Sequence, residues 1–169
     1  MPQHVSLPSY RDTVVANWVD YNGHLRDAFY LLIFSLATDT LIDRIGLPET
    51  VRNARRRSVF TVEAHVNYLH EIKEGAQVRV DMRVLGYDAK RLHLYLEMFA
   101  DSRDEPVAAG ELMLLHVDME GPRSVAFDPD VAAQIRQLAN AHAELPPPAF
   151  AGQVIGLPKH TQQTQHTVA

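Results

Sequence analysis

The sequence predicts an α+β domain in which an antiparallel sheet wraps around one long buried helix. The first observation behind this prediction is a charge-free stretch of 11 residues, 28–38, within a longer helical pattern. The second is that four strand patterns follow in succession before a short closing helical pattern. Consecutive strands joined by short turns pair antiparallel, and a helix that is apolar on nearly every side needs a curved sheet around it.

The first expected elements are a strand near residues 11–16, a turn and the long helix. Residues 10–19 are rich in β-forming side chains and show no helical stripe. The Asn-Gly pair at 22–23 indicates a turn, because both residues tolerate positive φ. Apolar residues then recur at helical spacing from about residue 26 to Ile45, and Gly46 fits the left-handed position that ends a helix. Such a helix of about 19 residues is roughly 28 Å long.

The second half of the chain reads as four strands and one helix. A polar connection over residues 46–57 leads to expected strands at 58–69, 77–85, 91–100 and 107–117, with turns at 86–88 and 101–106. The final helix is expected at residues 129–140. Residues 1–145 are expected to form one domain, and residues 146–169 an extended or poorly ordered C-terminal extension.

Composition excludes several classes of protein. Hydrophobic residues make up 46% and charged residues 22% of the 169, the balance of a soluble globular chain. The net charge of −5 argues against a nucleic-acid partner, and the absence of cysteine excludes disulfides, thiolate metal sites and cysteine nucleophiles. The longest charge-free apolar stretch is shorter than the 18 or so residues of a membrane span, and the first residues show no signal-peptide pattern. We therefore expect a cytoplasmic protein without a membrane partner.

The nine histidines raise the question of a metal site. The set comprises His4, His24, His65, His70, His93, His116, His142, His160 and His166. No two of them have the His-x-x-x-His spacing of a helical metal site, and no thiolate could assist them. We expect neither a catalytic metal nor a resident cofactor.

Four stretches resemble a known family. Residues 18–25, Trp-Val-Asp-Tyr-Asn-Gly-His-Leu, resemble the Asp-x-x-Gly-His loop of the 4-hydroxybenzoyl-CoA thioesterase-like branch of the hotdog-fold proteins. Residues 60–66, 90–94 and 112–118 are similar to one subgroup of that branch, the betainyl-CoA thioesterases of carnitine degradation, which also occur fused to carnitine dehydrogenases. The likeness covers roughly residues 10–145. It implies a hotdog fold and hydrolysis of an acyl-CoA, with coenzyme A as part of the substrate.

The resemblance implies that Asp20 is a nucleophile or general base and that a backbone N–H near Asp27 donates to the oxyanion. Hydrolysis needs both functions, and a helix N-terminus offers free N–H groups and the positive end of the helix dipole. We therefore expect Asp20 to face a cavity at this helix end. From the residues alone, Asp20 also fits an N-cap or an Asx turn. The carboxylate side chain of Asp27 departs from the family pattern, because a negative charge beside an oxyanion donor does not help to stabilise an oxyanion. We expect this side chain to cap the helix instead.

Other residues of the loop and the following strand have two interpretations each. Asn22 and Gly23 are expected to shape the turn, whereas His24 either orients a water or carbonyl or packs beneath the loop. Glu63 and His65 are two residues apart, so they are expected to share a strand face with Thr61 and Asn67. That row either lines the acyl pocket or assists Asp20; the alternatives are that it is the solvent face of the strand or a row of satisfied cross-strand pairs.

The implied substrate suggests two further groups of residues. A betainyl group carries a quaternary ammonium, which aromatic faces bind because it cannot donate hydrogen bonds. Trp18 and Tyr21 flank the loop aspartate, with Phe34, Phe60 and Tyr68 within reach, and we expect Trp18 or Tyr21 in the pocket; core packing is the alternative. The phosphates of CoA suggest Lys90, Arg91 and the run Arg55–Arg57, of which Arg57 is the chosen candidate; an ordinary solvated turn is the alternative.

Proteins of the hotdog fold pair their sheets edge to edge, so we expect a homodimer or homotetramer with sites at the interface. The expected activity is hydrolysis of a short, polar acyl-CoA. Two rival hypotheses stay open at this point: a hydratase or dehydratase on the same fold, and a non-catalytic protein that binds acyl-CoA or another small ligand.

Overall fold

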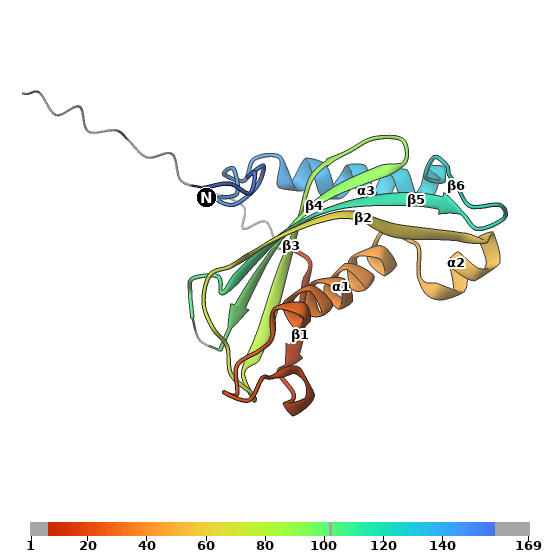
Figure 1. Cartoon of the computed structure of the whole chain (residues 1–169). Coiled ribbons are helices and arrows are strands. Elements are labelled where there is room, and N and C mark those ends of the chain that lie inside the picture. The colour runs from red at the N-terminus through yellow and green to blue at the C-terminus, as the bar shows by residue number, and fades with distance from the viewer. Residues whose placement is uncertain (1–6, 102, 158–169) are drawn as a thin grey trace, which may run out of the picture.

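The computed structural model describes residues 7–101 and 103–157, and it shows an antiparallel sheet curled around one long helix (Figure 1). The strand order is β1-β3-β4-β5-β2, with the short β6 beside β5. The strands are β1 Ser9–Thr13, β2 Arg57–Tyr68, β3 Gln77–Tyr87, β4 Arg91–Ala100, β5 Ala108–Asp118 and β6 Arg123–Ser124. The helices are α1 Asp27–Arg44, α2 Glu49–Arg55 and α3 Pro129–His142, with a 3-10 turn at Ala16–Trp18. The predicted α+β class and hotdog architecture are confirmed.

The elements differ from the predictions mainly where local patterns are short. The expected strand at 11–16 begins and ends earlier, and it gives way to the 3-10 turn that precedes the Asp20 loop. The connection at 46–57 contains the unpredicted α2, and a two-residue β6 follows β5. The predicted turn at 86–88 is partly strand, because a bulge between Val84 and Gly86 carries β3 onward to Tyr87.

Helix α1 ends as predicted but is less buried than predicted. Gly46 adopts φ +98°, and the amides of Gly46 and Leu47 donate to Asp43 and Ile42, which forms a Schellman motif. One side of α1 lies against the sheet, whereas Leu31 and Leu32 are 40% and 38% exposed. The prediction of a helix buried on all sides is therefore wrong for a single chain, because one curled sheet covers only one side of it.

Phe34 of α1 packs against the sheet at Gly110. Its side chain is fully buried in the core that α1 shares with β3, β4 and β5. A methyl group placed on Gly110 of β5 would lie 3.0 Å from the Phe34 ring. The absence of a side chain at Gly110 thus lets the aromatic ring approach the sheet backbone.

A β-bulge in β2 changes which residues share a face. The register against β5 shifts between Thr61 and Glu63, so that Thr61 pairs with Leu114 whereas Glu63 pairs with Met113. Leu114 belongs to the buried core, so Thr61 lies on the α1 side of the sheet and Glu63 on the opposite side. The prediction that Thr61 shares a face with Glu63 and His65 is wrong, because the extra residue reverses the alternation.

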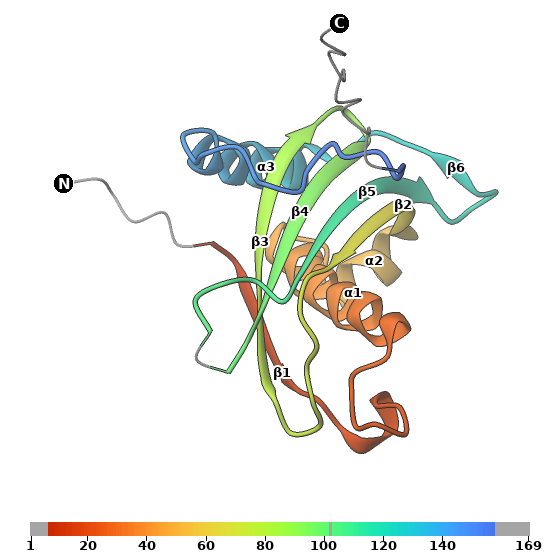
Figure 2. The same ribbon diagram turned by 60° about the vertical axis from the view of Figure 1, so that its left-hand side comes forward.

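The far face of the sheet carries the segment that follows α3. Helix α3 lies along the half of β3 that β1 leaves unpaired, where the Val84 N–H donates to His142 Nδ1 at 3.1 Å. The chain then crosses β3, β4 and β5 (Figure 2), with Arg83 donating to the carbonyls of Leu145 and Pro146. The Gly152 N–H donates to Glu111 at 2.7 Å. Part of the expected C-terminal extension, residues 158–169, lies outside the described residues. The same is true of His4, His160 and His166.

Among the described residues, no helix has the length and apolar character needed to cross a membrane.

Candidate functional site

The Asp20 carboxylate lies in a tight turn that leaves one of its oxygens free. Oδ1 accepts the backbone N–H groups of Asn22 at 2.8 Å and His24 at 3.1 Å, while Gly23 adopts φ +77°. The His24 N–H contributes most to holding the pKa of Asp20 below its ordinary value. Oδ2 makes no hydrogen bond to any described residue. The turn therefore presents an ionised carboxylate with an available oxygen, so the Asx-turn geometry is compatible with a chemical role.

The N-terminus of α1 follows this loop and offers a free amide. Arg26 occupies the N-cap position and makes no capping bond with its side chain. Asp27, the first residue of the helix, accepts the Ala28 N–H with Oδ1 at 2.9 Å, so its side chain engages the next amide without occupying the cap position that was expected. The Asp27 N–H itself has no acceptor within residues 7–101 and 103–157. An N–H at the positive end of an 18-residue helix can stabilise an oxyanion.

A cavity of about 280 Å³ opens beside this helix end. Asp27 and Tyr30 of α1, together with the end of β2 and the segment after it, form its wall: the other lining residues are Leu25, Tyr68, Leu69, His70 and Glu71. The Tyr68 hydroxyl donates to the Asp27 carbonyl at 3.3 Å, and the rings of Tyr30 and Tyr68 meet edge to face at 5.2 Å. A cavity is thus present at the helix end, but the expectation that Asp20 faces it is not met in the single chain, because Asp20 is not among its lining residues. We refer to it below as the helix-end cavity.

Asp20 is connected to the helix-end cavity but does not line it in the single chain. Nε2 of His24 lies 3.5 Å from the carboxylate of Glu71, which is one of the lining residues. The Leu25 N–H donates to the Ile72 carbonyl, which joins the loop to the segment that forms the cavity wall. The His24 side chain therefore pairs with a carboxylate of the cavity wall, which is neither of the two roles predicted for it.

The aromatic residues at the helix-end cavity are not the two that were expected there. Tyr21 is 94% exposed, because the Asn-Gly turn directs it outward, and Trp18 stacks on Phe29 with ring centroids 5.9 Å apart. Neither lines the cavity, so the placement of Trp18 or Tyr21 in the pocket is corrected to Tyr30 and Tyr68. Phe60 lies at the exposed middle of β2 and also does not line the cavity.

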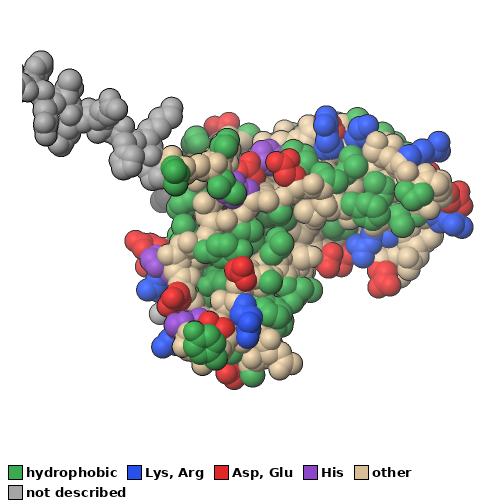
Figure 3. Space-filling view, in the orientation of Figure 1, with side chains coloured by type: hydrophobic (Ala, Val, Ile, Leu, Met, Phe, Trp, Pro, Cys, Tyr) green, Lys and Arg blue, Asp and Glu red, His purple; other side chains and the backbone are tan. Residues whose placement is uncertain are grey.

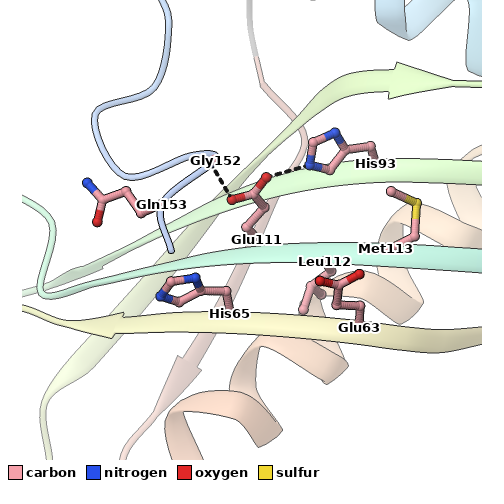
Figure 4. Close-up of a pocket in the computed structure, with 8 residues that line it drawn as sticks. All are labelled: Glu63, His65, His93, Glu111, Leu112, Met113, Gly152 and Gln153. Carbon is pink, nitrogen blue, oxygen red and sulfur yellow. Dashed lines mark hydrogen bonds and ion pairs between the residues drawn. The ribbon is translucent and has the colours of Figure 1, made fainter. Parts of the chain in front are cut away.

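Glu63 and His65 lie on the other side of the sheet from α1 (Figure 4). They line a separate cavity of about 290 Å³ with His93 and Glu111, over which residues 152–153 pass. His93 Nε2 lies 2.7 Å from Glu111. The sheet therefore separates Glu63 and His65 from the helix end, and neither side chain makes a hydrogen bond or an ion pair with another described residue.

The predicted CoA-binding residues lie at the opposite end of the sheet from the helix-end cavity. Arg57 lines a cavity of about 540 Å³ with Arg52 and Arg56, and in Figure 3 most visible Lys and Arg side chains gather at this end, over α2 and β6. Each of these arginines has an acidic neighbour; Arg57, for example, lies 2.7 Å from Asp118. The Lys90 side chain donates to Ser124 of β6, and Arg91 pairs with Asp88 in the β3–β4 turn. Neither residue lines this cavity.

Several lining residues were not recognised from the sequence. Tyr30 lies within the apolar stretch that was assigned to the core, and its hydroxyl donates to the His70 carbonyl at 3.1 Å. His70 and Glu71 follow a strand without any local motif, and Arg52 lies in the unpredicted α2. No local signal in the sequence could have identified these residues, because the fold alone brings them to the two cavities.

The chain is similar to thioesterases over most of its length. Residues 14–135 match the thioesterase-like superfamily. The betainyl-CoA thioesterase of Pseudomonas aeruginosa is 51% identical over 152 residues, which cover 90% of this chain and 96% of the relative. A Pseudomonas putida KT2440 protein, described as a proposed thioesterase, is 47% identical with a TM-score of 0.77, over 88% of this chain and 95% of the other. A hypothetical protein from Staphylococcus aureus, solved in complex with CoA, is 29% identical with a TM-score of 0.85, over 90% and 96%.

Proposed function

This chain belongs to the thioesterase-like superfamily and is an acyl-CoA thioesterase, and on that premise we propose that its substrate is betainyl-CoA. The free N–H of Asp27, at the end of α1 and beside a cavity, carries the chemical part of the proposal. The substrate assignment rests on the similarity to a relative that bears this name. A cavity of about 280 Å³ is at the small end of the range for ligand pockets, which favours a short acyl group.

The proposed reaction uses the two polar groups at the start of α1. Asp20 Oδ2 either attacks the thioester carbonyl carbon or removes a proton from a water that attacks it. The carbonyl oxygen becomes an oxyanion, which the Asp27 N–H and the helix dipole stabilise. The C–S bond then breaks, and the thiolate of CoA leaves and takes up a proton. If Asp20 is the nucleophile, water hydrolyses the resulting anhydride; by either route the products are the carboxylate and free CoA.

Thiol release from a panel of acyl-CoAs tests this function directly. The panel contains betainyl-CoA, acetyl-CoA, 3,3-dimethylbutanoyl-CoA and a long-chain acyl-CoA. We expect the highest kcat/KM for betainyl-CoA and the lowest for the long chain. If no thioester in the panel releases CoA above the buffer rate, the hydrolase assignment fails and a ligand-binding role becomes the better explanation.

The shape of β2 supports a homodimer through this strand. β2 ends the sheet and pairs with β5 on one side, which leaves the backbone groups of its other edge free within the described part of the chain. Phe60, Val62 and Tyr68 on the strand are 42%, 54% and 53% exposed, and Figure 3 shows hydrophobic side chains between the two ends of the molecule. An unpaired strand edge of 12 residues that exposes three large hydrophobic side chains is a surface that favours pairing with a second strand.

Such a dimer would complete the site. If two β2 strands pair antiparallel about a two-fold axis at their midpoint, the partner's Arg57 lies near Tyr68 at the helix-end cavity. The arginine-lined cavity of one subunit would then receive the CoA phosphates while the helix end of the other holds the acyl group. This arrangement gives the predicted CoA-binding role of Arg57 a geometry that a single chain lacks.

Replacing Val62 with Lys tests the dimer. A charged side chain on the β2 edge is expected to prevent strand pairing, so the particle should fall from twice the 19.0 kDa of the chain to a single chain, with loss of hydrolysis. Light scattering coupled to gel filtration measures the mass. Val15→Lys, at a hydrophobic residue that is 44% exposed and lies outside β2, is the matched control and should remain dimeric. A wild-type particle of 19 kDa would contradict the proposed assembly.

A further inference from the structure

The helix-end cavity combines negative charge with aromatic surface. Two of its lining residues, Asp27 and Glu71, are carboxylates, and none of the described residues that line it is Lys or Arg. The nearby His70 has its Nε2 4.0 Å from the carboxylate of Glu105, which adds a third acid to this end of the molecule. A group that enters this cavity therefore lies beside the carboxylates of Asp27 and Glu71, in addition to the N-terminus of α1.

The two tyrosines of the cavity present their rings rather than their hydroxyl groups. The Tyr30 hydroxyl donates to the His70 carbonyl, and the Tyr68 hydroxyl donates to the Asp27 carbonyl. Both hydroxyl protons are thus engaged by the backbone, and the edge-to-face contact holds the rings in place. The ring of Tyr68, which is 53% exposed, leaves aromatic surface for a ligand, whereas Tyr30 is 4% exposed and supports that ring from behind. Neither tyrosine offers a free hydroxyl donor to a neutral or anionic acyl group.

The carboxylates lie close enough for their charge to reach the rings. Burial raises the pKa of Tyr68, and the Asp27 carboxylate raises it further. Burial also raises the pKa of Tyr30, and Glu71 acts in the same direction. The contributions of Asp27 and Glu71 to these pKa directions agree with their position among the lining residues, beside the aromatic surface.

We propose that Tyr68 and Glu71 make the helix-end cavity selective for acyl groups that end in a quaternary ammonium. Such a cation donates no hydrogen bond, so it is bound by the field of a carboxylate and by the face of an aromatic ring, which is the combination found here. This inference rests on the proposed thioesterase function and extends it, because it assigns the selectivity to two residues and predicts that the positive charge of the acyl group, rather than its shape, is recognised.

A pair of thioesters of the same shape isolates the charge. Betainyl-CoA and 3,3-dimethylbutanoyl-CoA differ by the replacement of the ammonium nitrogen with carbon, so the ratio of their kcat/KM values reports the recognition of charge alone. We expect the wild-type enzyme to prefer betainyl-CoA by tenfold or more. Glu71→Gln should lower kcat/KM for betainyl-CoA by about tenfold and leave the neutral thioester within twofold. Tyr68→Leu should lower it by roughly threefold to thirtyfold, again selectively.

Two matched variants separate this role from a structural one. Tyr68→Phe keeps the ring and removes the bond to the Asp27 carbonyl, so it should retain the preference for the cation. Glu74→Gln neutralises an exposed carboxylate of the same segment that does not line the cavity, and it should leave both rates unchanged.

The outcomes distinguish the two proposals. Equal losses on both thioesters in Glu71→Gln and Tyr68→Leu, or no loss on either, would overturn the selectivity while leaving the thioesterase intact. A wild-type enzyme that hydrolyses the neutral thioester as fast as betainyl-CoA would do the same. A wild-type enzyme that hydrolyses neither thioester would remove the proposed function and this inference together.

Discussion

Replacing Asp20 with Asn is expected to lower kcat for thioester hydrolysis by about 10²- to 10⁴-fold, the usual contribution of a positioned general base. The amide oxygen of Asn can still accept the N–H groups of Asn22 and His24, so the turn is kept. What is lost is the negative Oδ2, which is free in the wild-type protein. Thiol release from betainyl-CoA measures the rate, and binding of the thioester to the variant by calorimetry should be retained.

The pH profile supplies a second test of Asp20. Its pKa lies below the ordinary 3.8, so the reactive carboxylate persists throughout the neutral range and is lost only as the pH falls through that low value. We expect kcat/KM to stay level on the acid side down to about pH 5. Asp39→Asn, at an exposed carboxylate on α1, is the control and should be fully active. The assignment would be contradicted if activity fell with a pKa near that of histidine as the pH is lowered, or if the Asp20→Asn variant were active.

The Phe34→Ala variant is expected to lose about 3–5 kcal/mol in the free energy of unfolding, the usual cost of removing a fully buried aromatic ring. This is a large part of the roughly 5–15 kcal/mol that stabilises a domain. The loss is expected at the upper end because the ring packs on the backbone at Gly110, which has no side chain to fill the space. Urea unfolding at constant protein concentration measures it, with an unchanged dependence on urea.

Neighbouring substitutions check the origin of this loss. Ser35→Ala, at the next and exposed position of α1, should change the unfolding free energy by less than about 0.5 kcal/mol. Gly110→Ala alone crowds the Phe34 ring and should destabilise, whereas the same change in the Phe34→Ala background should be neutral or favourable. Additive effects of the two substitutions would show that the ring and the glycine are not in contact.

Long periodic segments made most of the fold predictable. Three local patterns predicted elements that the structure contains where expected. They are the apolar stretch of α1, the strict alternation in β3 and β4, and the glycine at position 46, which adopts a left-handed conformation. Short elements were missed because seven residues of α2 or two of β6 carry too little periodicity to stand out from a loop. The Asp20 loop was recognisable because a tight turn places strict demands on consecutive residues.

The helix-end cavity shows what local patterns cannot contain. Tyr30 comes from the middle of an apolar helix, and Tyr68 and Glu71 come from the end of a strand about 40 positions later. No local pattern in either segment predicts that the two segments meet. Trp18 and Tyr21 were predicted instead because they are close to Asp20 in sequence. The outward direction of Tyr21 and the stacking of Trp18 on Phe29 result from the path of the chain in three dimensions.

The sequence alone determined the long helix α1, the four long strands β2 to β5, the helix α3 and the presence of a carboxylate just before a helix N-terminus, because each follows from periodicity or turn chemistry within one segment. Only the tertiary structure decided that Glu63 and His65 face away from α1, since a single bulged residue in β2 reverses the alternation. It also decided that one side of α1 and the edge of β2 stay open, because one sheet covers only the residues on its own side.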